Sequence, residues 1–148
     1  MHDWNDPDLL ARLKAHSAAQ GFNAWLGMTP VAVGNGRVEM TVAVKPEICQ
    51  HHGYVHGGVV GALADAACAW AGAAASGADV VTANYTLHFL APAVGEVLRA
   101  KGRVIRSGRT LVTVESEVWA EAEGKEPKKV AAGMASIAVL PARQPEAA

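Results

Sequence analysis

The stretch from His56 to Ala75, HGGVVGALADAACAWAGAAA, constrains the fold of this chain more than any other. Two glycines follow a histidine, and a run of small apolar residues then contains a single charged side chain, Asp65. The part from Val59 to Ala75 has no proline and many alanines, which favours a helix about 25 Å long. Because this helix is small or apolar on every side, we expect it to lie buried in the core.

A membrane-spanning helix is the alternative interpretation of this stretch, and it would need about 20 strongly apolar residues. The run consists mainly of alanine and glycine, carries Asp65 and lacks flanking basic anchors, so the sequence favours a core helix. The first ten residues, MHDWNDPDLL, are acidic and lack the basic-then-apolar layout of a signal peptide. We therefore expect a cytoplasmic protein that does not bind membranes.

Helical periodicity divides the surface of this segment into two sides. One side is nearly bare, so that a ligand or another backbone can approach it, and comprises Gly58, Gly61, Ala62, Asp65, Ala69 and Gly72. The other side is expected to pack against a sheet and comprises Val59, Leu63, Ala67 and Trp70.

Asp65 needs a reason to be inside such a helix, because burying an unpaired charge is costly. The backbone N–H groups of Gly57 and Gly58 lie at the N-terminal end of the helix, where glycine allows close approach of a substrate. We predict an oxyanion hole beside a carboxylate, which is equipment for attacking a carbonyl group with a base or a nucleophile. A purely structural role for Asp65 as a centre of hydrogen bonding is the alternative.

The composition is that of a globular protein and argues against several functional classes. The chain has 148 residues, of which 51% are hydrophobic and 18% charged, as expected for a single globular domain over 1–148. The net charge of −1 gives no basic field for nucleic acid. Two cysteines are too few for a disulfide framework, and the spacing of Cys49, His51 and His52 lacks the second cluster that a zinc site needs. We therefore expect no bound metal.

The N-terminal segment, residues 1–26, is predicted to be helical. Asp6-Pro7-Asp8 is a good helix start, and Gly21 is a natural stop. A short second turn follows, and its aromatic residues Phe22 and Trp25 are expected to cover the core. Gly34-Asn35-Gly36 then predicts a hairpin turn between strands over 28–33 and 37–44.

Strands are predicted over 80–90, 97–106, 110–121 and 129–140, followed by a loose tail over 141–148. In the strand over 80–90, alternation places Val81, Ala83, Tyr85, Leu87 and Phe89 on one face and Thr82, Asn84, Thr86 and His88 on the other. Basic residues of the next strand are expected to pair with acidic residues of the one after it. Consecutive strands imply an antiparallel meander with the helix on one face, and the apolar surface left uncovered predicts self-association.

Three segments carry a resemblance to a known family: GYVHGGVVGALADAA from Gly53, VTANYTLHFLAPAVGE from Val81 and IRSGR from Ile105. In this order they resemble the hotdog-fold acyl-CoA thioesterases, most closely the phenylacetate-pathway (PaaI-like) branch, over residues 26–139. The resemblance implies an α+β hotdog fold, in which an antiparallel sheet wraps around one long central helix. It also implies homodimers or homotetramers with active sites at the subunit interface, and no cofactor apart from the coenzyme A of the substrate.

The resemblance also implies roles for individual residues. Asp65 would be the catalytic base or nucleophile, the Gly57 N–H would polarise the thioester carbonyl, and His56 would position that end of the site. Thr82 matches a position that helps to hold the attacking water from the partner subunit, and Gln50 stands where the family often has asparagine.

Four further residues are expected to contact the substrate. Gly58 and Gly61 would lie against it, and Arg106 and Arg109 would pair with the phosphates of coenzyme A, although they are also typical surface arginines. The leading prediction is hydrolysis of an acyl-CoA or aryl-CoA thioester. The alternatives are a non-catalytic acyl-CoA-binding or regulatory protein and a dehydratase or hydratase on the same fold, because fold alone does not decide function.

Overall fold

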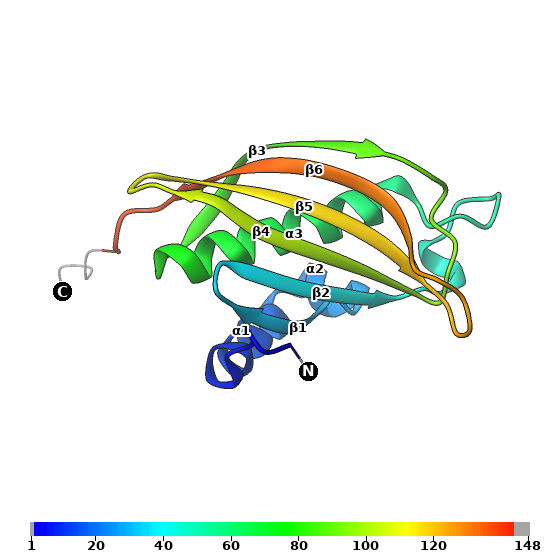
Figure 1. Ribbon diagram of the computed structural model, residues 1–148, viewed down its shortest axis with the longest axis horizontal. Helices are drawn as coiled ribbons and strands as arrows, with labels where there is room; N and C mark the ends of the chain where they lie inside the picture. Colours follow the sequence, from blue (N-terminus) through cyan, green and yellow to red (C-terminus); the bar gives the residue numbers. More distant parts are fainter. Residues whose placement is uncertain (1, 144–148) are drawn as a thin grey trace.

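The computed structural model describes residues 2–143, in which a curved antiparallel sheet wraps around one long helix (Figure 1). Of the expected tail, residues 144–148 lie outside the described residues. In spatial order the six strands of the sheet are β1 (Thr29–Gly34), β2 (Arg37–Ala43), β4 (Val97–Ser107), β5 (Leu111–Glu121), β6 (Lys128–Val139) and β3 (Val80–Phe89). This α+β architecture is the one expected from the sequence.

The central helix α3 (Gly57–Ser76) is long and apolar enough by composition to cross a membrane, but here it is the core helix inside the sheet. Its buried stripe comprises Val60, Gly61, Leu63, Ala64, Ala67, Cys68, Ala71 and Gly72. Of the residues expected to pack against the sheet, Leu63 and Ala67 are fully buried, whereas Val59 and Trp70 are half-buried and pack against the core from its margin.

The N-terminal segment forms α1 (Pro7–Ala19) and α2 (Gly21–Leu26), with a short 3-10 turn, η1 (Pro46–Ile48), further along the chain. The predicted start of α1 is confirmed, because Asp6 Oδ1 accepts hydrogen bonds from the N–H groups of Asp8 and Leu9, both at 3.0 Å. The predicted end of α1 is confirmed in position, since Gln20 is its C-cap and Gly21 follows directly. Gly21 does not have the left-handed conformation of a typical stop, however, and it begins α2, which itself ends at the left-handed Gly27, with φ of 74°.

Phe22 and Trp25 on α2 do not cover the core. Their side chains are 55% and 71% exposed, and the two rings lie 6.1 Å apart between centroids. The core side of this helix is provided by Leu26 and by the buried Asn23, whose side-chain amide donates a 3.1 Å hydrogen bond to Ser17 Oγ.

The expected meander is wrong for β3, which pairs with the last strand, β6, and forms an edge of the sheet. The connection after β3 crosses the ends of the other strands and is tied to them by backbone hydrogen bonds. Leu90 N–H donates to the Val130 carbonyl and Glu96 N–H to the Glu121 carbonyl, both at 2.8 Å. These bonds give hydrogen-bond partners to backbone N–H groups of a connection that is not itself part of the sheet.

A β-bulge between Thr82 and Asn84 changes which side chains of β3 face the helix. Thr82 is opposite Ile137 and Tyr85 is opposite Ala135, and both partners are buried toward α3. The predicted alternation, with Thr82 and Tyr85 on opposite faces, is therefore wrong. One extra residue in a strand reverses the alternation beyond it, and such bulges commonly re-aim a side chain.

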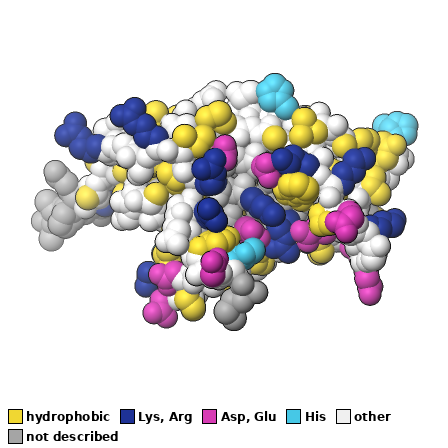
Figure 2. Space-filling model, in the orientation of Figure 1, with side chains coloured by type: hydrophobic (Ala, Val, Ile, Leu, Met, Phe, Trp, Pro, Cys, Tyr) yellow, Lys and Arg dark blue, Asp and Glu magenta, His cyan; other side chains and the backbone are white. Residues whose placement is uncertain are grey.

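The outer face of the sheet is charged, and Figure 2 shows basic and acidic side chains interspersed over it. The predicted cross-strand pairing is confirmed: Arg99 contacts Glu121 at 2.7 Å and Glu39 at 3.1 Å, and Arg103 pairs with Glu115. The hydrogen bond to Glu121 is the main reason why the pKa of Arg99 is raised. This face is therefore not the uncovered apolar surface expected from the sequence.

Candidate active site

His56 organises the first turn of α3. It is the N-cap residue, and its Nδ1 accepts a 2.9 Å hydrogen bond from the Gly58 N–H. Gly58 N–H is therefore occupied and does not serve as the second oxyanion donor predicted from the sequence. The first N–H groups of a helix have no intrahelical partner, and among the described residues the Gly57 N–H donates to no protein acceptor. One free donor remains at this end of the helix.

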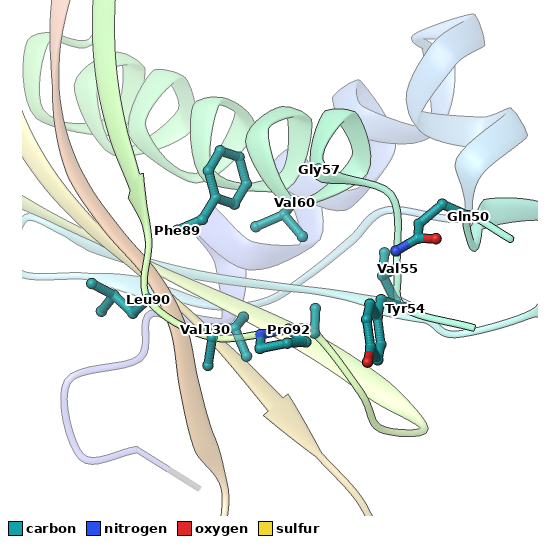
Figure 3. A pocket seen from close by; sticks show the side chains of 11 residues that line it. Gln50, Tyr54, Val55, Gly57, Val60, Phe89, Leu90, Pro92 and Val130 are labelled. Carbon is teal, nitrogen blue, oxygen red and sulfur yellow. The ribbon is translucent and has the colours of Figure 1, made fainter. Parts of the chain in front are cut away.

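An open pocket of about 440 Å³ lies at this free donor, lined by Gly57, Gln50, Tyr54 and apolar residues that include Phe89 (Figure 3). The Gln50 Oε1 accepts a 2.6 Å hydrogen bond from the His52 N–H. Since a backbone N–H only donates, this contact fixes the orientation of the amide and leaves Nε2 as a donor. The structure thus brings Gln50 and Gly57 together at one pocket.

Asp65 lies farther along α3 and contacts Thr82 of β3. The Thr82 hydroxyl donates a 2.7 Å hydrogen bond to Asp65 Oδ1, and both residues are partly buried. The β-bulge makes this contact possible because it turns Thr82 toward the helix. Thr82 therefore already touches Asp65 of its own chain, whereas the resemblance implied that it acts from the partner subunit.

The glycine side of α3 is not bare. A Cβ on Gly61 would lie 3.2 Å from the Tyr85 hydroxyl, and one on Gly57 would lie 3.4 Å from the Phe89 ring. Gly72 is covered by Ile137 in the same way. Tyr85 and Phe89 share one face of β3, as the alternation predicted, but their contact with the glycines of α3 is a tertiary property that alternation does not reveal. Gly61 consequently packs against this chain's own strand.

The two halves of the predicted site are well separated within one chain. Gly57 and Asp65 are eight positions apart on α3, which corresponds to about 12 Å along the helix axis. An oxyanion donor must lie about 2.7–3.1 Å from its oxygen, and a reacting group about 3–3.5 Å from its target. One chain therefore does not bring Gly57 and Asp65 to the same carbonyl group, in contrast to the expected oxyanion hole beside a carboxylate.

Arg106 and Arg109 lie near the opposite end of α3 from Gly57. Both are exposed at the turn between β4 and β5, which Figure 1 shows at the far end of the sheet from the start of α3. This turn is connected to the last strand by a 3.0 Å bond from Val139 N–H to the Thr110 carbonyl. The structure does not bring these arginines together with the Gly57 pocket of their own chain.

His51 and His52 lie side by side, with ring centroids 4.0 Å apart and the ring planes tilted by 43°. The described residues contain no cluster of three metal-binding side chains. Cys68 is only 1% exposed, and burial raises the pKa of its thiol to about 11. A buried neutral thiol of this kind behaves as a small core residue.

An antiparallel six-stranded sheet wrapped around one long central helix is the architecture of the hotdog fold. The family model of the thioesterase superfamily matches residues 52–126, which is more than half of the chain. The chain therefore belongs to the thioesterase superfamily, whose members hydrolyse thioesters.

Solved structures of related proteins agree with this assignment. A thioesterase family protein from Silicibacter pomeroyi is 29% identical, with a TM-score of 0.82 over 89% of this chain and 98% of that one. A phenylacetic acid degradation-related protein from Ralstonia eutropha is also 29% identical, with a TM-score of 0.74 over 88% and 99%. The PaaI protein of E. coli, at 23% identity, shares the fold with a TM-score of 0.77 over 88% and 94%.

Proposed function

We propose that this protein hydrolyses an acyl-CoA or aryl-CoA thioester at a site formed by two copies of the chain. The observation that carries the proposal is the division of the site between a free Gly57 N–H and an Asp65 carboxylate held by Thr82. An oxyanion donor and a general base are parts that acyl transfer uses, and their separation of about 12 Å along α3 supports a site in which each is completed by the other copy.

In the proposed reaction, the thioester carbonyl accepts hydrogen bonds from the Gly57 N–H and from Gln50 Nε2 of one chain. Asp65 of the second chain takes a proton from water, which attacks the carbonyl carbon and produces a tetrahedral oxyanion. Collapse of this intermediate breaks the carbon–sulfur bond, and coenzyme A leaves as a thiolate that is then protonated. In the nucleophilic variant, Asp65 itself attacks, and water hydrolyses the resulting anhydride.

The edge strand β3 supports the pairing of two copies. Its outer edge has no strand partner among residues 2–143, and Val81, Tyr85 and Phe89 are exposed along it. An exposed, apolar edge is a template for pairing with another strand. Pairing β3 with its own copy would extend the sheet and bring the two α3 helices into proximity, as a closed two-fold dimer requires.

The first test is release of free thiol from a panel of acyl-CoA thioesters by wild type and by Asp65→Asn. We expect turnover by wild type and its near-complete loss in the variant, with a circular dichroism spectrum that does not change. Glu115→Gln on the outer face of the sheet is the matched control for loss of a carboxylate, and it should retain wild-type turnover. Substantial activity in Asp65→Asn would remove this residue from the mechanism.

A second experiment tests whether two chains share each site. Gly57→Pro removes the proposed donor, and proline is accepted at the first position of a helix. His56 has φ of −58° and ψ of 136°, which lies outside the helical region that a following proline disfavours. Neither Gly57→Pro nor Asp65→Asn should be active alone.

Mixed dimers of these two variants should recover activity. Each mixed dimer contains one site with both residues intact, so a random mixture should recover about one quarter of wild-type activity in a two-fold dimer. Native mass spectrometry would measure the fraction of mixed dimers. If mixed dimers form and remain inactive, Gly57 and Asp65 do not serve a shared site, and the two-chain arrangement is wrong.

A further inference from the structure

A groove of about 990 Å³ lies between α3 and the N-terminal helices, and Asp65 lies in its wall. The α3 side of the groove is made of small side chains at helical spacing: Ala62, Ala66, Ala69, Ala73 and Ala74. Helix α1 packs on β1 and α2 rather than closely on α3, so the space above this row of alanines stays open. The groove is therefore continuous with the proposed catalytic carboxylate.

The interior of the groove is apolar. Leu9 and Leu13 of α1 face the alanines of α3, and Trp70, Met28 and Leu140 are among the further apolar residues of the lining. Polar side chains such as Arg12 and His16 are exposed, which places them at the rim. The side-chain amide of Asn23 already bonds to Ser17, and the carbonyls of α3 bond within their helix. A group in this groove meets few hydrogen-bond partners.

This lining distinguishes between the two parts of a thioester substrate. The pantetheine arm of coenzyme A carries amides, and burying an amide without a hydrogen-bond partner is costly. A hydrocarbon chain or an aromatic ring loses nothing in the same place. From Asp65 to Ala74 the groove follows α3 for nine positions, or about 14 Å. It therefore has the length and the chemistry for an apolar group attached to the carbonyl that Asp65 faces.

We propose that this groove receives the apolar acyl or aryl group of the substrate and that α1 and α2 set the length it accepts. The inference rests on the proposed function, because it assumes that the thioester carbonyl lies at Asp65. Helices α1 and α2 form the wall of the groove that faces α3, through Leu9, Leu13 and Phe22. The long side chain of Leu9 and the small side chain of Ala69 are then the specificity-determining features.

The test compares kcat/KM for thiol release from acetyl-, butyryl-, octanoyl- and phenylacetyl-CoA. Ala69 lies four positions, or about 6 Å, beyond Asp65, so Ala69→Leu would block the groove. We expect the ratio of octanoyl to acetyl turnover to fall about 10-fold or more, since misfitting a methylene group costs this much in a shaped pocket. Ala75→Leu is the matched control, because Ala75 is on the same helix but is exposed and outside the groove.

A second variant changes the α1 wall of the groove and should lengthen, rather than shorten, the acyl chain that the groove accepts. Leu9→Ala shortens an α1 side chain and should shift the preference toward longer chains, measured by adding decanoyl- and dodecanoyl-CoA to the panel. The proposal is overturned if Ala69→Leu lowers turnover equally for all chain lengths, or if Leu9→Ala leaves the ranking unchanged. If wild type releases thiol from none of the substrates, the proposed function fails instead. Calorimetric binding of octanoyl-CoA to wild type and Ala69→Leu then still decides whether the groove receives the acyl group.

Discussion

Gly102 of β4 determines how closely α3 approaches the sheet, and Gly102→Ala is the substitution that tests this contact. A Cβ at this position would lie 2.6 Å from the Ala67 carbonyl oxygen and 2.9 Å from its carbon. Both atoms belong to the helix backbone, two positions after Asp65, so no side chain can rotate away. Ordinary contacts between carbon and a carbonyl oxygen are about 3.3–3.6 Å. The helix or the strand would therefore have to move by about 0.7 Å.

Two opposing effects set the size of the change in stability. Overpacking a core that cannot relax costs about 1–3 kcal/mol. Replacing glycine by alanine at an unstrained position returns about 0.4–1 kcal/mol, because the unfolded chain loses freedom. Gly102 is not among the glycines with positive φ, so this second effect applies. We expect a net loss of about 1–2 kcal/mol in the free energy of unfolding, which lowers Tm by about 2–8 °C at this chain length.

Thermal unfolding followed by circular dichroism, together with thiol release, would measure the effect. Gly21→Ala is the matched control: nothing lies within 4 Å of a Cβ there, and its φ is not positive. The control should be as stable as wild type or more so. Gly102→Ala should also lower turnover, because the movement of α3 reaches the turn that carries Asp65. If Gly102→Ala were as stable as its control, the close packing of α3 on β4 would be refuted.

Thr82→Val should lower kcat about 10- to 100-fold, because it removes a hydrogen bond to a carboxylate that is worth about 1.5–3 kcal/mol, whereas Thr82→Ser should retain activity. Equal kinetics for the two variants would show that the hydroxyl is not needed. Asp6→Ala should lower the free energy of unfolding in urea by about 0.5–2 kcal/mol through loss of the helix cap, and an unchanged midpoint would argue against the cap. A thiol reagent at pH 8 should modify Cys49 first and leave Cys68 unreacted until the protein unfolds, because Cys68 is buried and its pKa is about 11. Rapid modification of both thiols in the native protein would contradict this burial.

The sequence predicts well those features that depend on local periodicity or on residue type. The central helix, the hairpin at Gly34 and the cap at Asp6 all follow from neighbours within a few positions. Pairing of β3 with β6 is a contact between distant segments, and hydrophobic alternation carries no information about strand order. The exposure of Phe22 and Trp25 is also a tertiary property, since an aromatic residue on a short helix has the same local pattern whether it is inside or outside.

The candidate site shows the same division. His56, Gly57 and Asp65 are recognisable from their types and spacing, but three other features decide what they can do. The hydrogen bond from Gly58 to His56 removes one donor. The bulge in β3 supplies Thr82 to Asp65. Neither this hydrogen bond nor the bulge is predicted by the spacing of His56, Gly57 and Asp65. The third feature is the distance between Gly57 and Asp65, which follows from helix geometry alone. It matters because two residues this far apart on one helix do not reach the same carbonyl group.

Assembly and catalysis should therefore be coupled through β3. Thr82, which holds Asp65, belongs to an edge strand that is paired on one side only, with β6. A strand with one free edge opens more readily than a strand paired on both sides, so pairing with a second copy would hold the bulge and the carboxylate in place. The same pairing would supply the Gly57 donor of the second chain. Dilution below the dissociation constant of the dimer should consequently remove turnover in parallel with the loss of dimer, rather than leave active monomers.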